Sequence, residues 1–269
     1  ITGNLPADFK PALTNKLPLV QTIRIVQPCN YARTVLIEAL QAAGVKVDAP
    51  AVAFNPVGLL PASNSYQSDT KVAELVGMPY SADARLILKV SYNIGADTSL
   101  LLFGLTQGVN DMGDALVVER KNLISNYGIP GGEFEFIDGS GGGLTTATNA
   151  AVTKMLLDMA AKPAFPAYFA ALPILGVDGS LAFVTDFQSD PTLAGARGQV
   201  NAKTGTFVLG SSAGLMLKTQ ALGGYIKTKS GRQLVYELVV NNVAITGLDG
   251  VLQAFQDEGR ISAILWRDY

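Results

Sequence analysis

The last third of the chain constrains the fold most, because strand-like runs alternate there with residues typical of turns. Residues 198–209, 221–228 and 233–241 are rich in β-branched and apolar side chains, and each run predicts a β-strand. Residues 229–232, Lys-Ser-Gly-Arg, favour a tight hairpin turn between the second and third strands. Both alternating faces of the third run are largely apolar, so we expect that strand to be covered on both sides.

Helical periodicity surrounds these strands. It predicts helices over residues 31–43 with Asn30 as N-cap, over 82–90, over 96–105, from a cap at Thr145 or Thr146 to Pro163, and from Leu248 through Phe255. The glycine cluster at residues 138–143 predicts a loop. Helices, then a meander of strands, then a closing helix are typical of a mixed α/β (α+β) domain in which helices flank an antiparallel sheet.

Composition excludes several kinds of chemistry. The 269 residues include no histidine, which removes Ser-His-Asp triads, histidine metal sites and histidine general bases. Cys29 is the one cysteine, so an internal disulfide and a Cys–His nucleophile are also excluded. We expect no metal and no cofactor, and the proton shuttle of any hydrolase built on this chain must be Lys, Ser, Tyr or a carboxylate.

Charge and hydropathy speak against two kinds of partner. The formal net charge of −2 gives no reason to expect nucleic acid or an anionic membrane surface. The longest apolar runs, such as residues 100–103, are far too short to span a membrane. The chain begins with Ile1 and has no basic-then-apolar leader, which we interpret as a cut upstream.

The run Lys203-Thr204-Gly205-Thr206 inside the first predicted strand is the strongest chemical signal. In serine acyl-transfer enzymes that use lysine, such a run presents a cation and hydroxyls to the substrate. The glycine leaves room for a substrate backbone beside the strand. The alternative is a solvated strand lysine beside small residues, and Lys-Ser-Gly at residues 229–231 fits that description as a turn.

Ser91-Tyr92-Asn93 is the second signal, because it lies between two predicted helices and upstream of the lysine strand. In this chemistry the serine relays a proton and the asparagine holds a substrate carbonyl; the alternative is a polar connector between helices. A nucleophile should come from Ser-x-x-Lys, and Ser68 to Lys71 is the one match in the sequence. We reject it as a polar loop that leads into a helix at Val72, within a proline-interrupted region.

Taken in order, these motifs resemble peptidase family S13, the D-alanyl-D-alanine carboxypeptidases and endopeptidases of the penicillin-binding protein 4 type. The similarity rests on residues 88–93, 138–141, 176–181, 196–206 and 221–225 and runs from about residue 28 to the end. It implies a penicillin-binding transpeptidase or β-lactamase-like domain. It also implies a periplasmic or extracytoplasmic location, with a peptidoglycan peptide or a β-lactam as ligand.

The resemblance implies a role for each site residue. Ser91 would protonate the leaving amine and Asn93 would orient the substrate amide. Lys203 would stabilise charge, while Thr204 and Thr206 would bind the terminal carboxylate of a stem peptide during formation of an acyl-enzyme. The substrate-binding residues implied in addition are Gly205 and Ser140.

In this family the Ser-x-x-Lys element precedes a large insert, so the chain is expected to lack its nucleophile and to be inactive alone. Residues 1–27, which end in a strand-like run at 19–26, would be the tail of an inserted accessory domain or a linker. Residues 28–269 would be the C-terminal part of the penicillin-binding domain, incomplete at its N-terminus. An incomplete sheet leaves an open edge, so we expect a homodimer or association with the N-terminal fragment.

Two alternatives keep the same fold. One is a β-lactamase or esterase-like hydrolase, and the other is a non-catalytic module that binds the cell wall or another protein.

Overall fold

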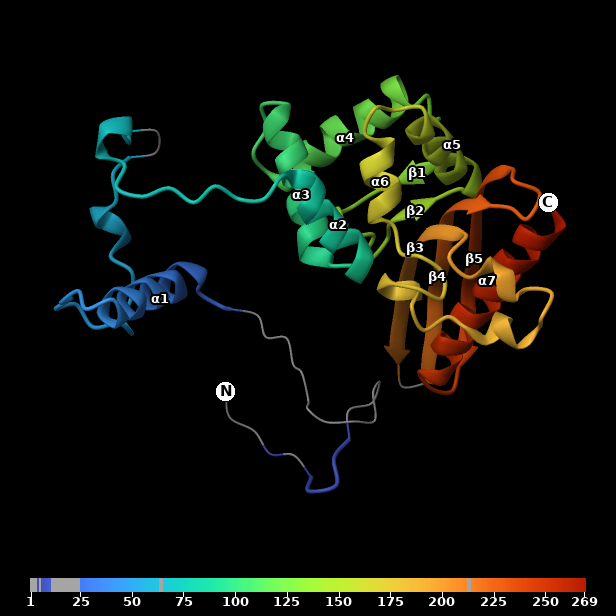
Figure 1. Ribbon diagram of the computed structural model, residues 1–269. Helices are drawn as coiled ribbons and strands as arrows, with labels where there is room; N and C mark the ends of the chain where they lie inside the picture. The colour runs from blue at the N-terminus through green and yellow to red at the C-terminus, as the bar shows by residue number, and fades with distance from the viewer. Residues whose placement is uncertain (1–3, 5, 11–24, 63–64, 212–213) are drawn as a thin grey trace. The chain divides into compact units, whose positions relative to one another are not determined.

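The computed structural model describes residues 4, 6–10, 25–62, 65–211 and 214–269. The chain divides into two compact units, Ile1–Val76 and Gly77–Tyr269. Each unit is described by itself (Figure 1).

The first unit holds one α-helix, α1 (Pro28–Ala42), and two 3-10 turns, η1 (Val57–Leu59) and η2 (Ser68–Thr70), among its described residues. The prediction that Asn30 caps this helix was wrong. Asn30 lies inside α1, and its Oδ1 accepts a hydrogen bond from the Asn55 backbone N–H at 2.7 Å. Most of the strand predicted over 19–26 falls outside the described residues, and a domain boundary after residue 27 stays a prediction.

Six α-helices lie in the described part of the second unit: α2 (Tyr80–Val90), α3 (Asn93–Thr106), α4 (Met112–Asn126), α5 (Asn149–Ala160), α6 (Phe165–Ala171) and α7 (Asp249–Asp268). No helix begins at Val72, contrary to prediction, because α2 starts at Tyr80. The predicted cap of α5 is also corrected: the Thr148 hydroxyl accepts from the Ala151 N–H at 3.1 Å. Helix α4 was not predicted, since its charged residues are dispersed along the segment.

The main sheet of the second unit has three antiparallel strands in the order β3-β4-β5. They are β3 (Val200–Ser211), β4 (Gly214–Lys227) and β5 (Gln233–Ile245), and a short ribbon pairs β1 (Phe134–Glu135) with β2 (Thr146–Ala147). The predicted hairpin turn is confirmed, since the Thr228 N–H donates to the Arg232 carbonyl at 2.8 Å and Gly231 has φ +90°. The β3–β4 hairpin continues beyond the predicted strand ends, and a bulge separates Phe207 from Val208.

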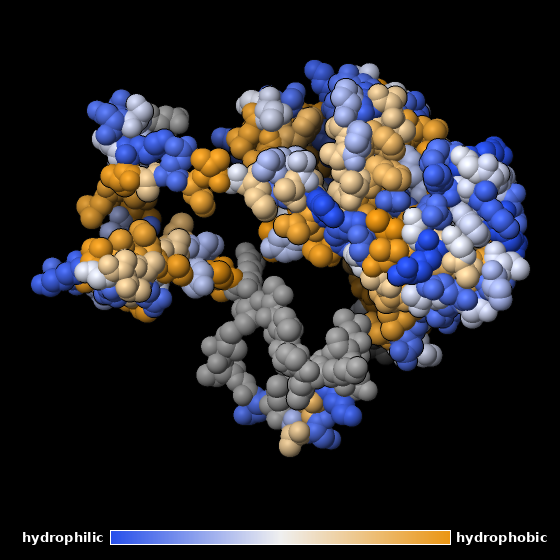
Figure 2. Space-filling model, viewed as in Figure 1, coloured by the Kyte–Doolittle hydropathy of each residue, from blue (hydrophilic) through white to orange (hydrophobic). Residues whose placement is uncertain are grey.

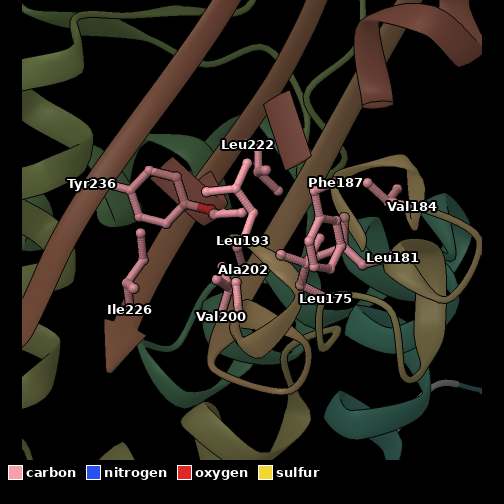
Figure 3. Close-up of a cluster of buried hydrophobic side chains, with 12 residues drawn as sticks. Leu175, Leu181, Val184, Phe187, Leu193, Val200, Ala202, Leu222, Ile226 and Tyr236 are labelled. Carbon is pink, nitrogen blue, oxygen red and sulfur yellow. The ribbon is translucent and has the colours of Figure 1, made fainter. Parts of the chain in front are cut away.

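Helices cover both faces of this sheet (Figure 1). On the α7 face, Figure 3 shows Val200, Ala202 and Leu222 from the sheet packed with Phe187 and other side chains of the segments that precede β3. On the opposite face, Tyr225 packs with residues of α5 and α6. Full burial of a leucine or phenylalanine stabilises by about 1.5–3 kcal/mol, so this two-sided packing stabilises the sheet as a whole.

The third strand is covered on both sides, as predicted, because Leu234 packs on the α7 face and Val235 on the α5 face. In the part of the chain that the structure describes, β5 pairs with β4 alone. On the side of the second unit seen in Figure 2, hydrophobic surface gathers over α2, α3 and α6, while the α7 side is mainly hydrophilic. None of the described helices is long and apolar enough to cross a membrane.

Candidate active site

The C-terminus of α2 sets the position of Ser91. This serine follows the helix in the left-handed conformation, with φ 56° and ψ 55°, and the Tyr92 N–H closes the turn on the Ile87 carbonyl at 3.0 Å. A left-handed conformation costs a non-glycine residue about 1 kcal/mol or more, so neighbouring groups must hold it. Such strain is common at functional sites.

An ion pair between a buried lysine and a partly exposed aspartate fixes this end of α2. The Lys89 ammonium donates to both carboxylate oxygens of Asp178 at 2.7 Å and to the Leu172 carbonyl at 2.6 Å. Gly179, at φ +59°, lets its own backbone approach α2 so closely that a Cβ there would lie 2.7 Å from the Lys89 carbonyl oxygen. The segment around Asp178 therefore clamps the helix end, and with it Ser91.

Strand β3 brings a lysine to the same point. Lys203 Nζ lies 2.6 Å from Ser91 Oγ, although 112 residues separate the two in the chain, and it also donates to the Thr204 carbonyl. Burial lowers the pKa of Lys203 to about 8. At neutral pH the group is mostly a cation, and its pKa is close enough to neutrality for it to exchange a proton with a hydrogen-bonded serine.

The two threonine hydroxyls of the strand have partners within the protein. Thr204 Oγ1 is hydrogen-bonded to Ser180 Oγ at 2.7 Å, and the Thr206 hydroxyl donates to Gln220 Oε1 at 2.7 Å. Ser180 belongs to the same clamp segment as Asp178, so this segment orients both Thr204 on β3 and Ser91 at the end of α2.

The glycine-rich loop forms another wall. Asp138 Oδ1 accepts hydrogen bonds from the backbone N–H groups of Ser140, Gly141 and Gly142 at 2.7–3.1 Å. The Gly139 N–H donates to Asp97 Oδ1 at 3.0 Å, which ties the loop to α3. Ser140 is therefore held half-buried at the rim rather than on a loose loop.

All seven site residues predicted from the sequence line one cavity of about 600 Å³: Ser91, Asn93, Ser140, Lys203, Thr204, Gly205 and Thr206. Asn93 reaches it as the first residue of α3. The alternative interpretations of the motifs as a surface lysine and a simple helix connector do not predict this convergence. Ser68 belongs to the first unit, where Lys71 is exposed and pairs with Glu74 at 2.6 Å.

Glu119 on α4 also lines the cavity and was not predicted. Burial raises the pKa of its carboxyl to about 7. No sequence motif marks Glu119. It could have been found only by predicting α4 and the side of that helix that faces the cavity.

This arrangement suits acyl transfer without histidine or metal. A serine hydroxyl and a partly desolvated lysine share a hydrogen bond beside an exposed strand edge, where a substrate backbone can pair. Within the described residues, no three His, Cys, Asp or Glu side chains are grouped so that they could hold a metal ion.

The sequence matches the family model described as the D-Ala-D-Ala carboxypeptidase 3 (S13) family over residues 1–254. The chain belongs to this family. Residues 1–254 include every residue of the candidate site described above, and the family resemblance inferred from the motifs is confirmed.

Solved structures agree on the fold of this S13 chain. Penicillin binding protein 4 (dacB) from Haemophilus influenzae is 19% identical, with a TM-score of 0.51 over 69% of this chain and 39% of that chain. The Bd0816 predatory endopeptidase from Bdellovibrio bacteriovorus, solved with its immunity protein Bd3460, is 18% identical, with a TM-score of 0.54 over 91% of this chain and 57% of that chain.

The S13 chain therefore spans less than two thirds of the length of these structures. At such identities the likeness shows the fold alone, and it confirms the mixed α/β penicillin-binding fold predicted from the sequence. A comparison with curated protein sequences found no match.

Proposed function

We propose that the protein is a serine-type D-Ala-D-Ala carboxypeptidase or endopeptidase that acts on peptidoglycan stem peptides through an acyl-enzyme. The observation that carries this proposal is the 2.6 Å contact between Lys203 Nζ and Ser91 Oγ, two residues that line one cavity in a chain without histidine. Membership of the S13 family supports it independently.

Each wall of the cavity has a role in the proposed reaction. Lys203 and Ser91 pass a proton to the leaving amine, which is D-alanine in the carboxypeptidase reaction. Asn93 orients the substrate amide, and the backbone N–H of Thr206 contributes to the oxyanion hole. Gly205 keeps the edge of β3 open for the substrate backbone, since a Cβ there would have only Ala221 Cβ nearby, at 3.8 Å.

The terminal carboxylate of the peptide is bound by the cation of Lys203 and the hydroxyls of Thr204 and Thr206. Ser140 contributes from the glycine loop. Because the Thr206 hydroxyl already donates to Gln220, binding of an anion by this hydroxyl requires a rearrangement of that hydrogen bond.

The nucleophile is proposed to come from a Ser-x-x-Lys segment outside these 269 residues. The one such motif in the sequence, Ser68 to Lys71, lies in the first unit with its lysine paired to Glu74. The apolar space beside the cavity, about 580 Å³ and lined mainly by α2 to α6, has room for such a segment.

Covalent labelling of the whole protein with fluorescent penicillin tests this function. We expect one labelled serine, located by mass spectrometry in a Ser-x-x-Lys sequence outside residues 1–269. The variant Ser91→Ala is expected to slow labelling by about 10²–10⁴-fold, the usual contribution of a positioned proton donor. Lys154→Met, which changes a half-exposed lysine of α5, is the control and should label normally.

Three outcomes would contradict the proposal in whole or in part. A label on Ser68 would show that the nucleophile was misassigned. No label on the whole protein would favour the non-catalytic cell-wall-binding or interaction module. Rapid hydrolysis of β-lactams or simple esters, with no release of D-alanine from peptides, would favour the β-lactamase or esterase alternative.

We place the protein in the periplasm or another extracytoplasmic compartment, where its peptide substrate lies. The unpaired edge of β5 in the described structure supports association with a second copy or with an N-terminal fragment. Light scattering on the purified chain tests this, and a stable monomer without a bound partner would contradict it.

A further inference from the structure

A line of hydrogen bonds leads from the proposed anion site into the interior. Thr206 lines the cavity, its hydroxyl donates to Gln220 Oε1 at 2.7 Å, and Gln220 Nε2 donates to Glu258 Oε2 at 3.1 Å. The three residues lie on β3, β4 and α7 respectively. Gln220 is 0% exposed and Glu258 is 1% exposed, so the carboxyl is sealed behind the sheet.

Glu258 has an incomplete set of partners. Its Oε1 accepts no hydrogen bond from the described residues, which is costly for a buried carboxylate oxygen. Desolvation accordingly raises the pKa of Glu258 to about 7, and the Gln220 hydrogen bond opposes that shift. The carboxyl therefore changes its protonation state close to neutral pH.

Few other titratable groups face Glu258. From β5 it meets Tyr236, whose hydroxyl is hydrogen-bonded to Ser262 of α7 at 3.0 Å and whose pKa burial raises further above its ordinary value. The strands β3 and β4 present Thr206 and Gln220 there, and η5 (Ala194–Ala196) carries no titratable side chain. Asp186 of η4 (Asp186–Ser189) is exposed.

The donor directions show what the ionised carboxylate does. An ionised Glu258 can only accept, so Gln220 must turn its NH₂ group toward it and its carbonyl toward Thr206. The Thr206 hydroxyl then donates its one hydrogen to Gln220 Oε1, as in the structure. In this state the Thr206 hydroxyl can only accept a hydrogen bond from the cavity, so the hydroxyl cannot bind an anion there.

Protonation of Glu258 reverses every donor in the line. Its O–H donates to Gln220 Oε1 once the amide has turned by half a rotation, which exchanges two groups of nearly equal size. The Gln220 NH₂ then donates to Thr206 Oγ1, and the hydroxyl hydrogen of Thr206 becomes available to the cavity. No atom is left with fewer partners than before.

We propose that Glu258 is a positioning residue that acts through Gln220 and sets the hydrogen-bond direction of Thr206, so that the site takes up a proton when it binds a carboxylate. The inference rests on the proposed function, because it assumes that the ligand of Thr206 is the terminal carboxylate of a D-alanyl peptide. The relay itself exists without ligand and can be tested separately.

The first test needs no ligand. In ¹⁵N-labelled protein, the side-chain amide signals of Gln220, identified by their absence in Gln220→Met, should shift with pH about a midpoint near 7. In Glu258→Gln the transition should disappear, because the new amide donates to Gln220 at every pH. Glu237→Gln is the matched control, because burial also raises the pKa of Glu237 to about 7. Tyr236 faces α7, and successive side chains of a strand point to opposite faces, so Glu237 lies on the face away from Glu258.

The second test measures calorimetric binding of N-acetyl-D-alanyl-D-alanine. Between pH 6 and pH 8, loss of the Glu258 proton should weaken binding about tenfold and loss of the Lys203 proton about twofold further. Because Glu119 lines the same cavity and its pKa is also about 7, the comparison is made in a Glu119→Gln background. In that background the parent protein and its Glu237→Gln variant should lose about twentyfold in affinity, and Glu258→Gln only about twofold. The C-terminal amide of the dipeptide should show no Glu258-dependent change.

Three results are decisive. A Gln220 signal that does not shift near pH 7, or that shifts unchanged in Glu258→Gln, would overturn the relay. A twentyfold fall in dipeptide affinity that persists in Glu258→Gln would overturn its coupling to the ligand. Absence of dipeptide binding at any pH, with the Gln220 transition intact, would refute the proposed function and leave the relay standing.

Discussion

Replacing Lys203 by methionine should change how the stability of the second unit depends on pH. The lysine is desolvated between Ser91 and the sheet, and burial lowers its pKa from 10.5 to about 8. Methionine fills a similar volume without charge. The substitution therefore removes a charged group whose partial desolvation on folding is unfavourable.

The difference between pKa values of 10.5 and about 8, at 1.36 kcal/mol per unit, corresponds to about 3 kcal/mol. Below pH 8 both the folded and unfolded states are protonated, and the folded state carries the whole cost of the buried cation. As the pH rises from 8 to 10.5 the unfolded state binds more protons, so the wild type gains stability relative to the variant. The lost hydrogen bonds to Ser91 and Thr204 add an offset but not this slope.

Urea denaturation at several pH values between 7 and 10.5 measures the effect. Trp266, the one tryptophan of the sequence, lies on α7 against the main core and reports on the second unit. The free energy of unfolding of the wild type minus that of Lys203→Met should rise by about 3 kcal/mol across this range. A difference that stays constant within about 0.5 kcal/mol would refute the desolvation argument. Lys154→Met, at a lysine whose side chain is 43% exposed, is the control.

Two further substitutions test the clamp on α2. Lys89→Met removes the lysine partner of Asp178 and of the Leu172 carbonyl and should lower the free energy of unfolding by about 3 kcal/mol. This is the low end of the range for a buried pair, because the Asp178 side chain is 36% exposed. Lys154→Met, the control, should lower the free energy of unfolding by at most about 0.5 kcal/mol. Gly179→Ala should lower the free energy of unfolding by about 1–3 kcal/mol, because an alanine at φ +59° is strained and its Cβ would lie 2.7 Å from the Lys89 carbonyl oxygen. The resulting shift of α2 should also slow penicillin labelling. Labelling at the normal rate would mean that the clamp does not position Ser91.

The elements that the sequence predicted well are those specified by nearest neighbours. The β4–β5 turn needs a glycine with positive φ, and Gly231 supplies it whatever lies around it. Elements that depend on packing were harder to predict. Thr148 rather than Thr145 or Thr146 caps α5, and α4 escaped prediction because dispersed charges hide its inward face.

The sequence by itself determined the three-stranded meander, the closing helix and the kind of chemistry. Alternation, turn residues and the lack of histidine are local or compositional facts, and the lack of histidine limits the proton shuttle of a hydrolase to Lys, Ser, Tyr or a carboxylate. Tertiary structure alone decided the contact between Ser91 and Lys203 and the low pKa of that lysine, since both depend on burial between segments 112 residues apart. It also decided the line from Thr206 to Glu258, because desolvation and donor direction are properties of the packed interior.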